Sequence, residues 1–278
     1  MVDLVISSCH SNHIEVWKVA AERLIKFVPS NRYIVVVPDS EVSLFESCSP
    51  PQIEVIPESD TLGDLGNALE QKVVNASNTV RKGWYLQQFL KLATLFDHRH
   101  LEQVVIWDAD TVPLRPIRFF DEVSGSPIYY TSNERHLSYL DCVQCILGLD
   151  RLGSETFVAQ CFPILGVDIR ALHTSLESDN LTWWEVMLNC IDFSLESGFS
   201  EYELLGTFVL SRHLTIARQT GKWVRDGKLL WKSAEKIPEV PRILGRSLDF
   251  VAFESWHRRT WRSWPRRLQV QRYSILRT

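Results

Sequence analysis

The sequence predicts an α/β fold in which one central sheet, mixed but mostly parallel, is flanked by helices. Short apolar runs alternate with stretches of helical periodicity, and the runs lie at 4–8, 33–38, 53–57 and 103–107. Such alternation is typical of a parallel sheet with helices on both faces. No break in composition divides the 278 residues. We therefore expect one domain over 1–254, followed by a basic segment over 255–278.

Local signals place the other elements. Asn12 and Glu15 fit a capping box that opens a helix ending near Phe27. The stretch GWYLQQFLKLATLF predicts a second helix over about 84–97. The rest of the chain is less regular, and there we expect strands at 126–132, 161–169 and 248–254 and helices at 181–193 and 201–213.

Composition excludes several classes of protein. A net charge of −4 and a pI near 6.1 argue against a nucleic-acid binder. No apolar run approaches the roughly 18 residues of a membrane-spanning helix, and the N-terminus lacks the basic flank of a signal peptide. We therefore expect a cytoplasmic protein with reduced cysteines. Cys142 and Cys145 form a single CxxC, which indicates either a metal or redox site or two small buried helix residues.

Two acids one residue apart end the run QVVIW. Asp108 and Asp110 follow it directly, and ligands of such sheets bind beyond the carboxyl ends of strands. Two carboxylates this close repel unless a cation lies between them or one is protonated. Oxygen ligands suit Mg²⁺ or Mn²⁺, and Mg²⁺ often completes its coordination with substrate phosphates. The pair predicts a divalent metal that carries a phosphorylated ligand; the alternative is two turn or cap aspartates.

The preceding helix carries a narrow polar stripe. It is apolar around most of its circumference, and Gln87, Lys91 and Thr94 fall in one arc at about 100° per residue. We expect Gln87, Gln88 and Lys91 to line the ligand site, with the lysine near a diphosphate. The alternative is a lysine that lies along the surface beside two solvated glutamines.

The block FLKLATLFDHRHLEQVVIWDADTVPLRPI (89–117) resembles the central block of metal-dependent glycosyltransferases with the A-type nucleotide-sugar fold. It is similar to glycogenin and the bacterial lipopolysaccharide galactosyltransferases, which share a Lys-Leu helix, an apolar strand and Asp-Ala-Asp-Thr. GWYLQQFLKL also resembles a little-characterised bacterial glycosyltransferase-like family. The resemblance implies a single Rossmann-like nucleotide-sugar-binding domain and a role in polysaccharide biosynthesis.

The resemblance also implies roles for particular residues. In that family the two aspartates bind Mn²⁺ or Mg²⁺, and the metal binds the diphosphate of a nucleotide sugar, usually UDP-linked. Here these residues are Asp108, which also contacts the ribose, and Asp110. The family's lysine near the donor corresponds to Lys91. The nucleotide base lies at the end of the first strand, which here offers Ser7 and Ser8.

Fewer of the family's acceptor-side residues can be matched to positions in this sequence. CFPILGVDIRAL (161–172) takes the place of the family's Asn-x-Gly-Val strand. Pro163 and Ile164 stand where the asparagine is expected, so sugar contacts there are not carried over. Metal sites of this kind often add a histidine from near the C-terminus. We expect His257 in that role, with His213 as its rival; the alternatives are an exposed histidine and a core or surface histidine.

An acid beside the transferred sugar is expected in GFSEYELLG (198–206), where related enzymes place one. A carboxylate can stabilise an oxocarbenium-like transition state or deprotonate the acceptor hydroxyl. Glu201 and Glu203 are both candidates, and the sequence does not separate them. Ser200 and Glu203 also fit a capping box, and Glu201 would lie in the first helical turn, so the alternative is helix capping.

The segment 255–278 contains seven arginines and no acid, and tryptophans interleave with the arginines. The arginines could clamp the donor diphosphate or an anionic acceptor. The segment could instead contact the inner face of a membrane as a peripheral element. A third reading is a C-terminal helix that covers the core.

The sequence therefore predicts a metal-dependent glycosyltransferase that moves a sugar from a nucleotide sugar, on the resemblance a UDP-sugar, to a glycan or lipid-linked acceptor. The metal would act as a Lewis acid on the leaving diphosphate. One alternative is a metal-dependent nucleotidyltransferase, against which SSCHSNH (7–13) lacks the usual glycine-rich loop. The other is a non-catalytic nucleotide- or sugar-binding module, which would bind without turnover.

Overall fold

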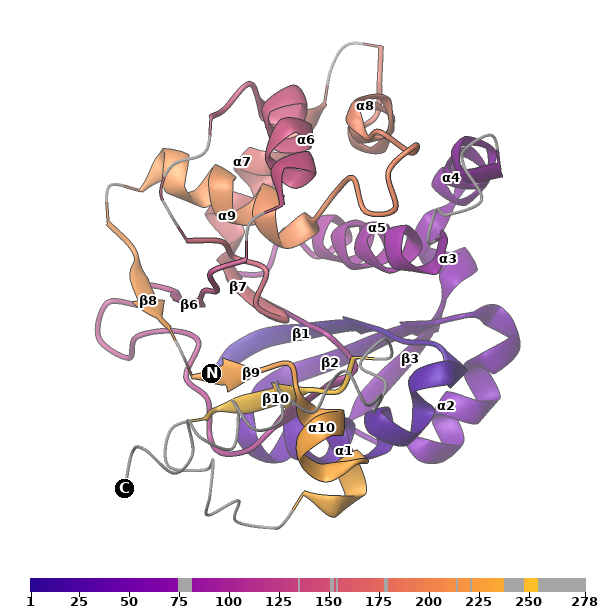
Figure 1. Cartoon of the computed structure of the whole chain (residues 1–278), viewed down its shortest axis with the longest axis vertical. Helices are drawn as coiled ribbons and strands as arrows, with labels where there is room; N and C mark the ends of the chain where they lie inside the picture. The colour runs from indigo at the N-terminus through magenta and orange to yellow at the C-terminus, as the bar shows by residue number, and fades with distance from the viewer. Residues whose placement is uncertain are drawn as a thin grey trace.

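A five-stranded sheet forms the middle layer of the fold (Figure 1). The structure is a computed structural model that describes residues 1–74, 82–134, 136–150, 153, 155–177, 180–213, 215–220, 222–237 and 248–254. The strands are β1 (Val2–Ser8), β2 (Ser30–Val37), β3 (Ile53–Pro57), β4 (Gln103–Trp107) and β7 (Cys161–Leu165). Their order is β3-β2-β1-β4-β7; the first four are parallel, and β7 is antiparallel to β4. The predicted mixed, mostly parallel sheet flanked by helices is confirmed.

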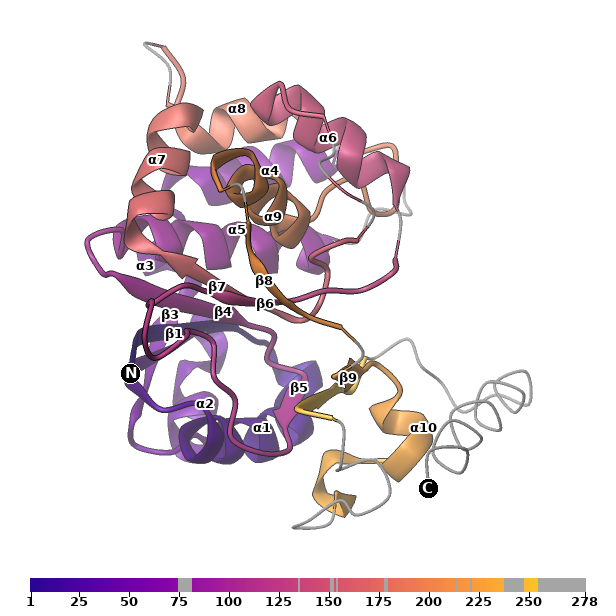
Figure 2. The ribbon, with the colours of Figure 1, turned by 90° about the vertical axis from the view of Figure 1, so that its left-hand side faces the viewer.

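Helices cover both faces of this sheet (Figures 1 and 2). On one face lie α1 (Ile14–Phe27) and α2 (Val42–Cys48). On the other face lie α4 (Asp64–Val74), α5 (Lys82–Asp97), α6 (Leu137–Leu147), α7 (Gly166–Leu176), α8 (Trp183–Cys190) and α9 (Glu201–Arg212). A hydrophobic core lies on each face of the sheet, and alternate strand residues point into the two cores. Ile6 and Val36 pack in the core that contains α5 residues, whereas Val5 and Val35 pack in the core that contains α1 residues.

A second, three-stranded sheet brings the end of the described chain back to the two aspartates. Its strands are β5 (Thr111–Pro113), β10 (Phe250–Ala252) and β9 (Trp223–Val224), in the order β5-β10-β9. The backbone N–H of Phe253 donates to the carbonyl of Asp110 over 2.8 Å. The remaining elements are β6 (Ile128–Tyr130), which pairs with β8 (Ala217–Gln219), the helices α3 (Glu58–Leu62) and α10 (Gly227–Trp231), and 3-10 turns at Ser11–His13, Asp39–Glu41 and Ala234–Lys236.

Two expectations about element boundaries are wrong. The capping box at Asn12 is absent, because a 3-10 turn precedes α1 and the helix begins at Ile14 without a side-chain cap. The strand expected over 161–169 ends at Leu165, and α7 begins at Gly166. A Cβ on Gly166 would lie 2.1 Å from the carbonyl oxygen of Leu101, so this glycine lets the chain turn against neighbouring backbone. Apolar residues continue from β7 into the buried side of α7, so the sequence pattern gave no sign of the turn between them.

The expectation that all cysteines are reduced is wrong for two of them. Cys145 of α6 and Cys190 of α8 form a disulfide, and their Cα atoms are 5.6 Å apart, a separation that suits this bond. Cys142 is a buried thiol on α6. The CxxC is therefore split between a crosslink and the helix core.

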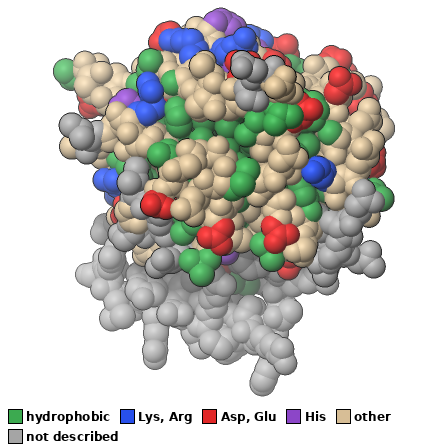
Figure 3. All heavy atoms as spheres, turned by 90° about the horizontal axis from the view of Figure 1, so that it is seen from above, with side chains coloured by type: hydrophobic (Ala, Val, Ile, Leu, Met, Phe, Trp, Pro, Cys, Tyr) green, Lys and Arg blue, Asp and Glu red, His purple; other side chains and the backbone are tan. Residues whose placement is uncertain are grey.

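The outer surface on the helical side mixes hydrophobic and charged side chains (Figure 3). No helix in the part of the chain that the structure describes is long and apolar enough to cross a bilayer. The basic segment predicted over 255–278 lies outside the described residues.

Gly206 allows α9 to approach the segment that leads into β7. A Cβ at this position would lie 2.0 Å from Cδ2 of Phe157, a buried ring in the core. We predict that Gly206→Ala lowers the free energy of unfolding by about 1–3 kcal/mol, because the added methyl group overpacks this contact. Urea denaturation measures the change. Ser211→Ala, at an exposed position of the same helix, is the control and should change stability by less than about 0.5 kcal/mol. Equal stability of the two variants would contradict the close approach.

Candidate functional site

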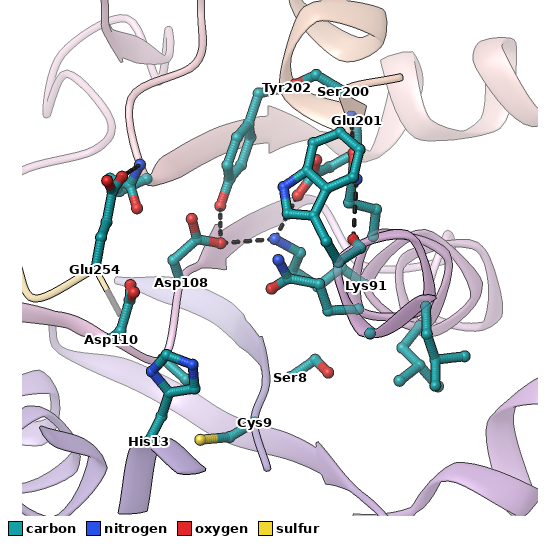
Figure 4. A pocket seen from close by; sticks show the side chains of 18 of the residues that line it. Ser8, Cys9, His13, Lys91, Asp108, Asp110, Ser200, Glu201, Tyr202 and Glu254 are labelled. Atoms are coloured by element: carbon teal, nitrogen blue, oxygen red, sulfur yellow. Dashed lines mark hydrogen bonds and ion pairs between the residues drawn. The ribbon is translucent and has the colours of Figure 1, made fainter. Parts of the chain in front are cut away.

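A cavity of about 950 Å³ lies at the carboxyl ends of four parallel strands, between the sheet and α5 and α9. Ser8 of β1, Pro38 after β2, Glu58 after β3 and Asp108 after β4 all line it. This is the edge of the sheet at which the sequence predicted a ligand site. Figure 4 shows that the labelled side chains converge on the space between β1, α5 and α9.

Asp108 and Asp110 lie in a tight turn between β4 and β5, and both line the cavity. The N–H of Thr111 donates to the carbonyl of Asp108 over 3.0 Å and closes the turn. The turn, rather than a regular strand, brings the two carboxylates to the same space. Burial and then the charge of Asp108 raise the pKa of Asp110 from 3.8 to about 7.

Lys91 is the buried cation of the site. Its ammonium group is 2.6 Å from Oδ1 of Asp108 and forms a second ion pair with Glu201, and its side chain is 1% exposed. Tyr202 donates its hydroxyl to the same Oδ1 over 2.6 Å. Burial opposes the charge on Lys91, but the two carboxylates outweigh it and raise the pKa of the lysine. Lys91 lines the cavity as predicted, yet its charge is neutralised by two acids rather than offered to a diphosphate.

The other polar residues of the predicted stripe on α5 have different environments. Gln88 accepts a hydrogen bond from the backbone N–H of Glu201 over 3.0 Å and so caps the start of α9. Its amide nitrogen donates to the carbonyl of Trp84 over 3.0 Å. Gln87 also lines the cavity. Thr94 is buried and bonds to the carbonyl of Leu90 in its own helix, so it does not belong to the site.

The structure separates the two candidate acids of α9. Glu201 lines the cavity, and its carboxylate meets Lys91. Burial raises the pKa of Glu201, and Lys91 opposes that rise. Glu203 does not line the cavity; it accepts a hydrogen bond from Thr156 over 2.5 Å, and its backbone N–H donates to Ser200 over 3.4 Å. Of the two candidate acids, Glu201 therefore lies in the cavity wall and Glu203 lies outside it.

The first strand contributes one of its two predicted serines. Ser8 lines the cavity, whereas Ser7 is fully buried and does not line it. Successive side chains of a strand point to opposite faces, so two neighbours cannot both serve one face. Ser7 therefore lies outside the cavity wall, in the buried part of the strand. Cys9 follows Ser8 in the lining, and burial, followed by the charge of Asp110, raises the pKa of its thiol, which therefore stays protonated.

The predicted histidines are not in the described cavity wall. His213 lies at the far end of α9 from Glu201, bonds to buried Asp168 over 3.0 Å and is outside the cavity wall. His257 lies outside the described residues. A histidine that the sequence did not single out, His13, lines the cavity. Burial and then His10 lower its pKa to about 4, so this ring is neutral at physiological pH.

The second sheet adds residues that sequence reasoning missed. Glu254 follows β10 and lines the cavity beside Asp110 (Figure 4). Arg225 lies 3.4 Å from Glu254 and 2.8 Å from Glu134. Gln160 donates to Glu254 over 3.3 Å, and its φ of 66° is a left-handed conformation that non-glycine residues rarely adopt. A signal for Glu254 existed, because LDFVAFE ends an apolar run in an acid, as QVVIWD does.

Carboxylates outnumber cations in the cavity wall. Seven line it: Glu41, Glu58, Asp108, Asp110, Glu134, Glu201 and Glu254. Among the described lining residues, the lysines and arginines are Lys91 and Arg225, and each is paired with two of these acids. The wall is therefore acidic, and a diphosphate would be repelled from it unless a cation entered as well.

A divalent cation fits the two aspartates on the chemistry of the donor set. Oδ2 of Asp108 has no hydrogen-bond partner among the described residues, and the Asp110 carboxylate accepts a long hydrogen bond of 3.5 Å from the Thr111 hydroxyl. Hard carboxylate oxygens of this kind suit Mg²⁺ or Mn²⁺. Within the described ranges, no group of three or more His, Cys, Asp or Glu side chains could hold a metal.

Comparison with known proteins identifies the family of the chain. A protein-family model described as a family of unknown function (DUF6492) matches residues 2–223. The chain belongs to this family. A comparison with curated proteins found no match. The DUF6492 match includes both aspartates, Lys91 and Glu201, whereas Glu254 lies beyond it.

We predict that Lys91→Met lowers the free energy of unfolding by about 3–5 kcal/mol, because it leaves two buried acids without their cation. Lys82→Met is the matched control: Lys82 lies in the same helix and pairs with Glu70 in solvent, so its loss should cost at most about 1 kcal/mol. Adding Glu201→Gln to Lys91→Met should recover part of the loss, since one unpaired charge is removed. Denaturation of the four proteins tests this, and similar losses for the two lysines would contradict it.

The raised pKa values of Asp110 and Glu254 predict how stability depends on pH. Burial raises the pKa of Glu254 from 4.5 to about 8, although Arg225 opposes the rise. The folded protein holds both protons more tightly than the unfolded chain, so stability is lost as pH rises from about 5 to 8. In a chelator-containing buffer we expect this loss to be smaller for Asp110→Asn than for the wild type. Identical pH dependence of the two proteins would show that Asp110 has an ordinary pKa.

Proposed function

We propose that this protein is a metal-dependent glycosyltransferase that transfers a sugar from a UDP-sugar to a hydroxyl group of a glycan acceptor. The observation that carries the proposal is the pair Asp108 and Asp110 in an acidic cavity whose lysine and arginine, among the described lining residues, are already paired. A nucleoside diphosphate enters such a cavity only with a divalent cation. The resemblance of 89–117 to A-type glycosyltransferases agrees with this chemistry.

The layout of the cavity supports a division into two halves. Ser8, Cys9 and Pro38 lie at the strand ends, where a uracil and ribose would bind against the sheet. Glu201 and Tyr202 lie at the start of α9, on the other side of the contact between Lys91 and Asp108 (Figure 4). The diphosphate would lie between the halves, beside Asp108 and Asp110, and the sugar would point toward α9.

The transfer breaks the bond between the anomeric carbon and the diphosphate oxygen, and that oxygen keeps the electron pair. A bond forms between the anomeric carbon and the acceptor oxygen, whose proton leaves to a base. The divalent cation, when bound, stabilises the charge that develops on the leaving diphosphate. Glu201 would stabilise the positively charged sugar or accept the proton. Lys91 and Gln88 orient Glu201 by binding its carboxylate and its backbone N–H.

Calorimetric titration of UDP into the protein, with and without Mn²⁺, tests the donor half. We expect UDP to bind only with Mn²⁺, and Asp110→Asn to weaken that binding about tenfold or more because it removes a charged ligand of the cation. Asp141→Asn, at an exposed carboxylate outside the cavity wall, should bind as the wild type does. Release of UDP from UDP-sugars then separates an enzyme from a binding module.

Two outcomes would count against the proposal. UDP binding that is equally strong without a divalent cation would mean that the Asp-Ala-Asp turn holds no metal. Preference for another nucleotide, with the same metal dependence, would keep the site and replace UDP as the donor nucleotide.

A further inference from the structure

We infer that Tyr202 is a positioning residue that leaves Asp108 a single oxygen for a divalent cation, so that the site selects Mg²⁺ or Mn²⁺ over Ca²⁺. This inference rests on the proposed function and concerns the cation of that same site. Tyr202 is the second residue of α9, it is buried, and it lines the cavity. Its hydroxyl reaches the turn after β4 that carries Asp108 (Figure 4).

Among the described residues, side chains donate to only one oxygen of the Asp108 carboxylate. Lys91 donates to Oδ1 over 2.6 Å, and the hydroxyl of Tyr202 donates to the same atom over 2.6 Å. A carboxylate oxygen has two lone pairs, so these two donors occupy both of them. Oδ2 has no hydrogen-bond partner in the described part of the chain, and it is therefore the oxygen that can bind a cation.

Tyr202 is held in this position by a closed ring of contacts. Glu201, its neighbour in α9, pairs with Lys91, and Lys91 pairs with Asp108. The ammonium group of Lys91 also lies 4.8 Å from the centre of the Tyr202 ring, which adds a cation–π contact. Gln88 accepts a hydrogen bond from the backbone N–H of Glu201 and so fixes the start of the helix. The carboxylate of Asp108 therefore cannot turn without breaking two hydrogen bonds.

The number of available carboxylate oxygens distinguishes the divalent cations. Ca²⁺ takes about six to eight oxygen ligands, and it binds carboxylates through one or both oxygens. Mg²⁺ demands an octahedral shell, which carboxylates, waters and substrate phosphates complete together. Mn²⁺ suits the same kind of oxygen ligands. With Oδ1 occupied, Asp108 supplies one oxygen only, which suits Mg²⁺ and Mn²⁺ and withholds a ligand that Ca²⁺ would use.

Tyr202→Phe removes the hydroxyl and keeps the ring over Lys91. It frees one lone pair of Oδ1, whereas Lys91 keeps the other, so both oxygens of Asp108 could then bind the same cation. Asp110 is not changed directly, because its carboxylate accepts a long hydrogen bond of 3.5 Å from Thr111 rather than from the tyrosine. A change of cation preference in this variant therefore reports on Asp108.

Calorimetric titration of UDP into the full chain, with Mn²⁺ or with Ca²⁺ at equal concentration, tests the inference. We expect the wild type to bind UDP at least about tenfold more tightly with Mn²⁺ than with Ca²⁺. In Tyr202→Phe this ratio should fall about threefold or more, because Asp108 loses a contact that orients it for Mn²⁺ and gains a second oxygen for Ca²⁺. Tyr129→Phe removes a hydroxyl from a buried tyrosine of β6 outside the cavity wall. This matched control should keep the wild-type ratio.

A merely structural role of Tyr202 would weaken UDP binding equally with both cations and leave the ratio unchanged. That result overturns the inference, and so does loss of binding with both cations in Tyr202→Phe. The wild type alone gives a second test, since equal binding of UDP with Mn²⁺ and with Ca²⁺ would also overturn the inference. In these cases the wild type still binds UDP with a divalent cation, and the donor site stands. If the wild type binds UDP with neither cation, the proposed function fails instead.

Discussion

A buried lysine held between two carboxylates is the constraint on which the site depends. Lys91 comes from α5, Asp108 from the turn after β4 and Glu201 from the start of α9, so one ammonium group fixes three elements that are far apart in the sequence. Removing these charges from water is costly, and the arrangement is stable only because the three groups compensate one another. Tyr202 donates a hydrogen bond to the Asp108 carboxylate, and Gln88 accepts one from the backbone N–H of Glu201, so both residues are held in place.

This compensation leaves the cavity with an excess of negative charge. Lys91 and Arg225 are each shared by two acids, and the carboxylate of Asp110 is not among those they bind. The second sheet adds another carboxyl group, because the pairing of β10 with β5 brings Glu254 beside Asp110, and the raised pKa of Glu254, about 8, keeps this group largely protonated at neutral pH. An acidic cavity at the carboxyl ends of parallel strands suits a cation and its bound anion together, and the proposal of a metal-dependent nucleotide-sugar site rests on this charge.

The sequence predicted the features that depend on a local pattern of residues. It did not predict those that depend on contacts between segments far apart in the chain. β4, α5 and the two aspartates were readable, because apolar periodicity and the abrupt change to acids are local signals. Strand alternation excludes Ser7 from the face of Ser8, but the sequence does not show which face borders the cavity. Glu201 and Glu203 differ through Lys91 and Thr156, which come from distant segments. The ion pairs of Lys91 and the position of Glu254 in the cavity also depend on contacts between distant segments. Sequence periodicity therefore does not predict them.

Crystals grown with UDP and Mn²⁺, measured at the manganese absorption edge, would test the central claim most directly. We predict one strong anomalous peak roughly 2 Å from carboxylate oxygens of both Asp108 and Asp110 and from diphosphate oxygens of UDP. UDP bound at the strand ends with no manganese between it and the two aspartates, or manganese bound elsewhere in the cavity, would contradict the account.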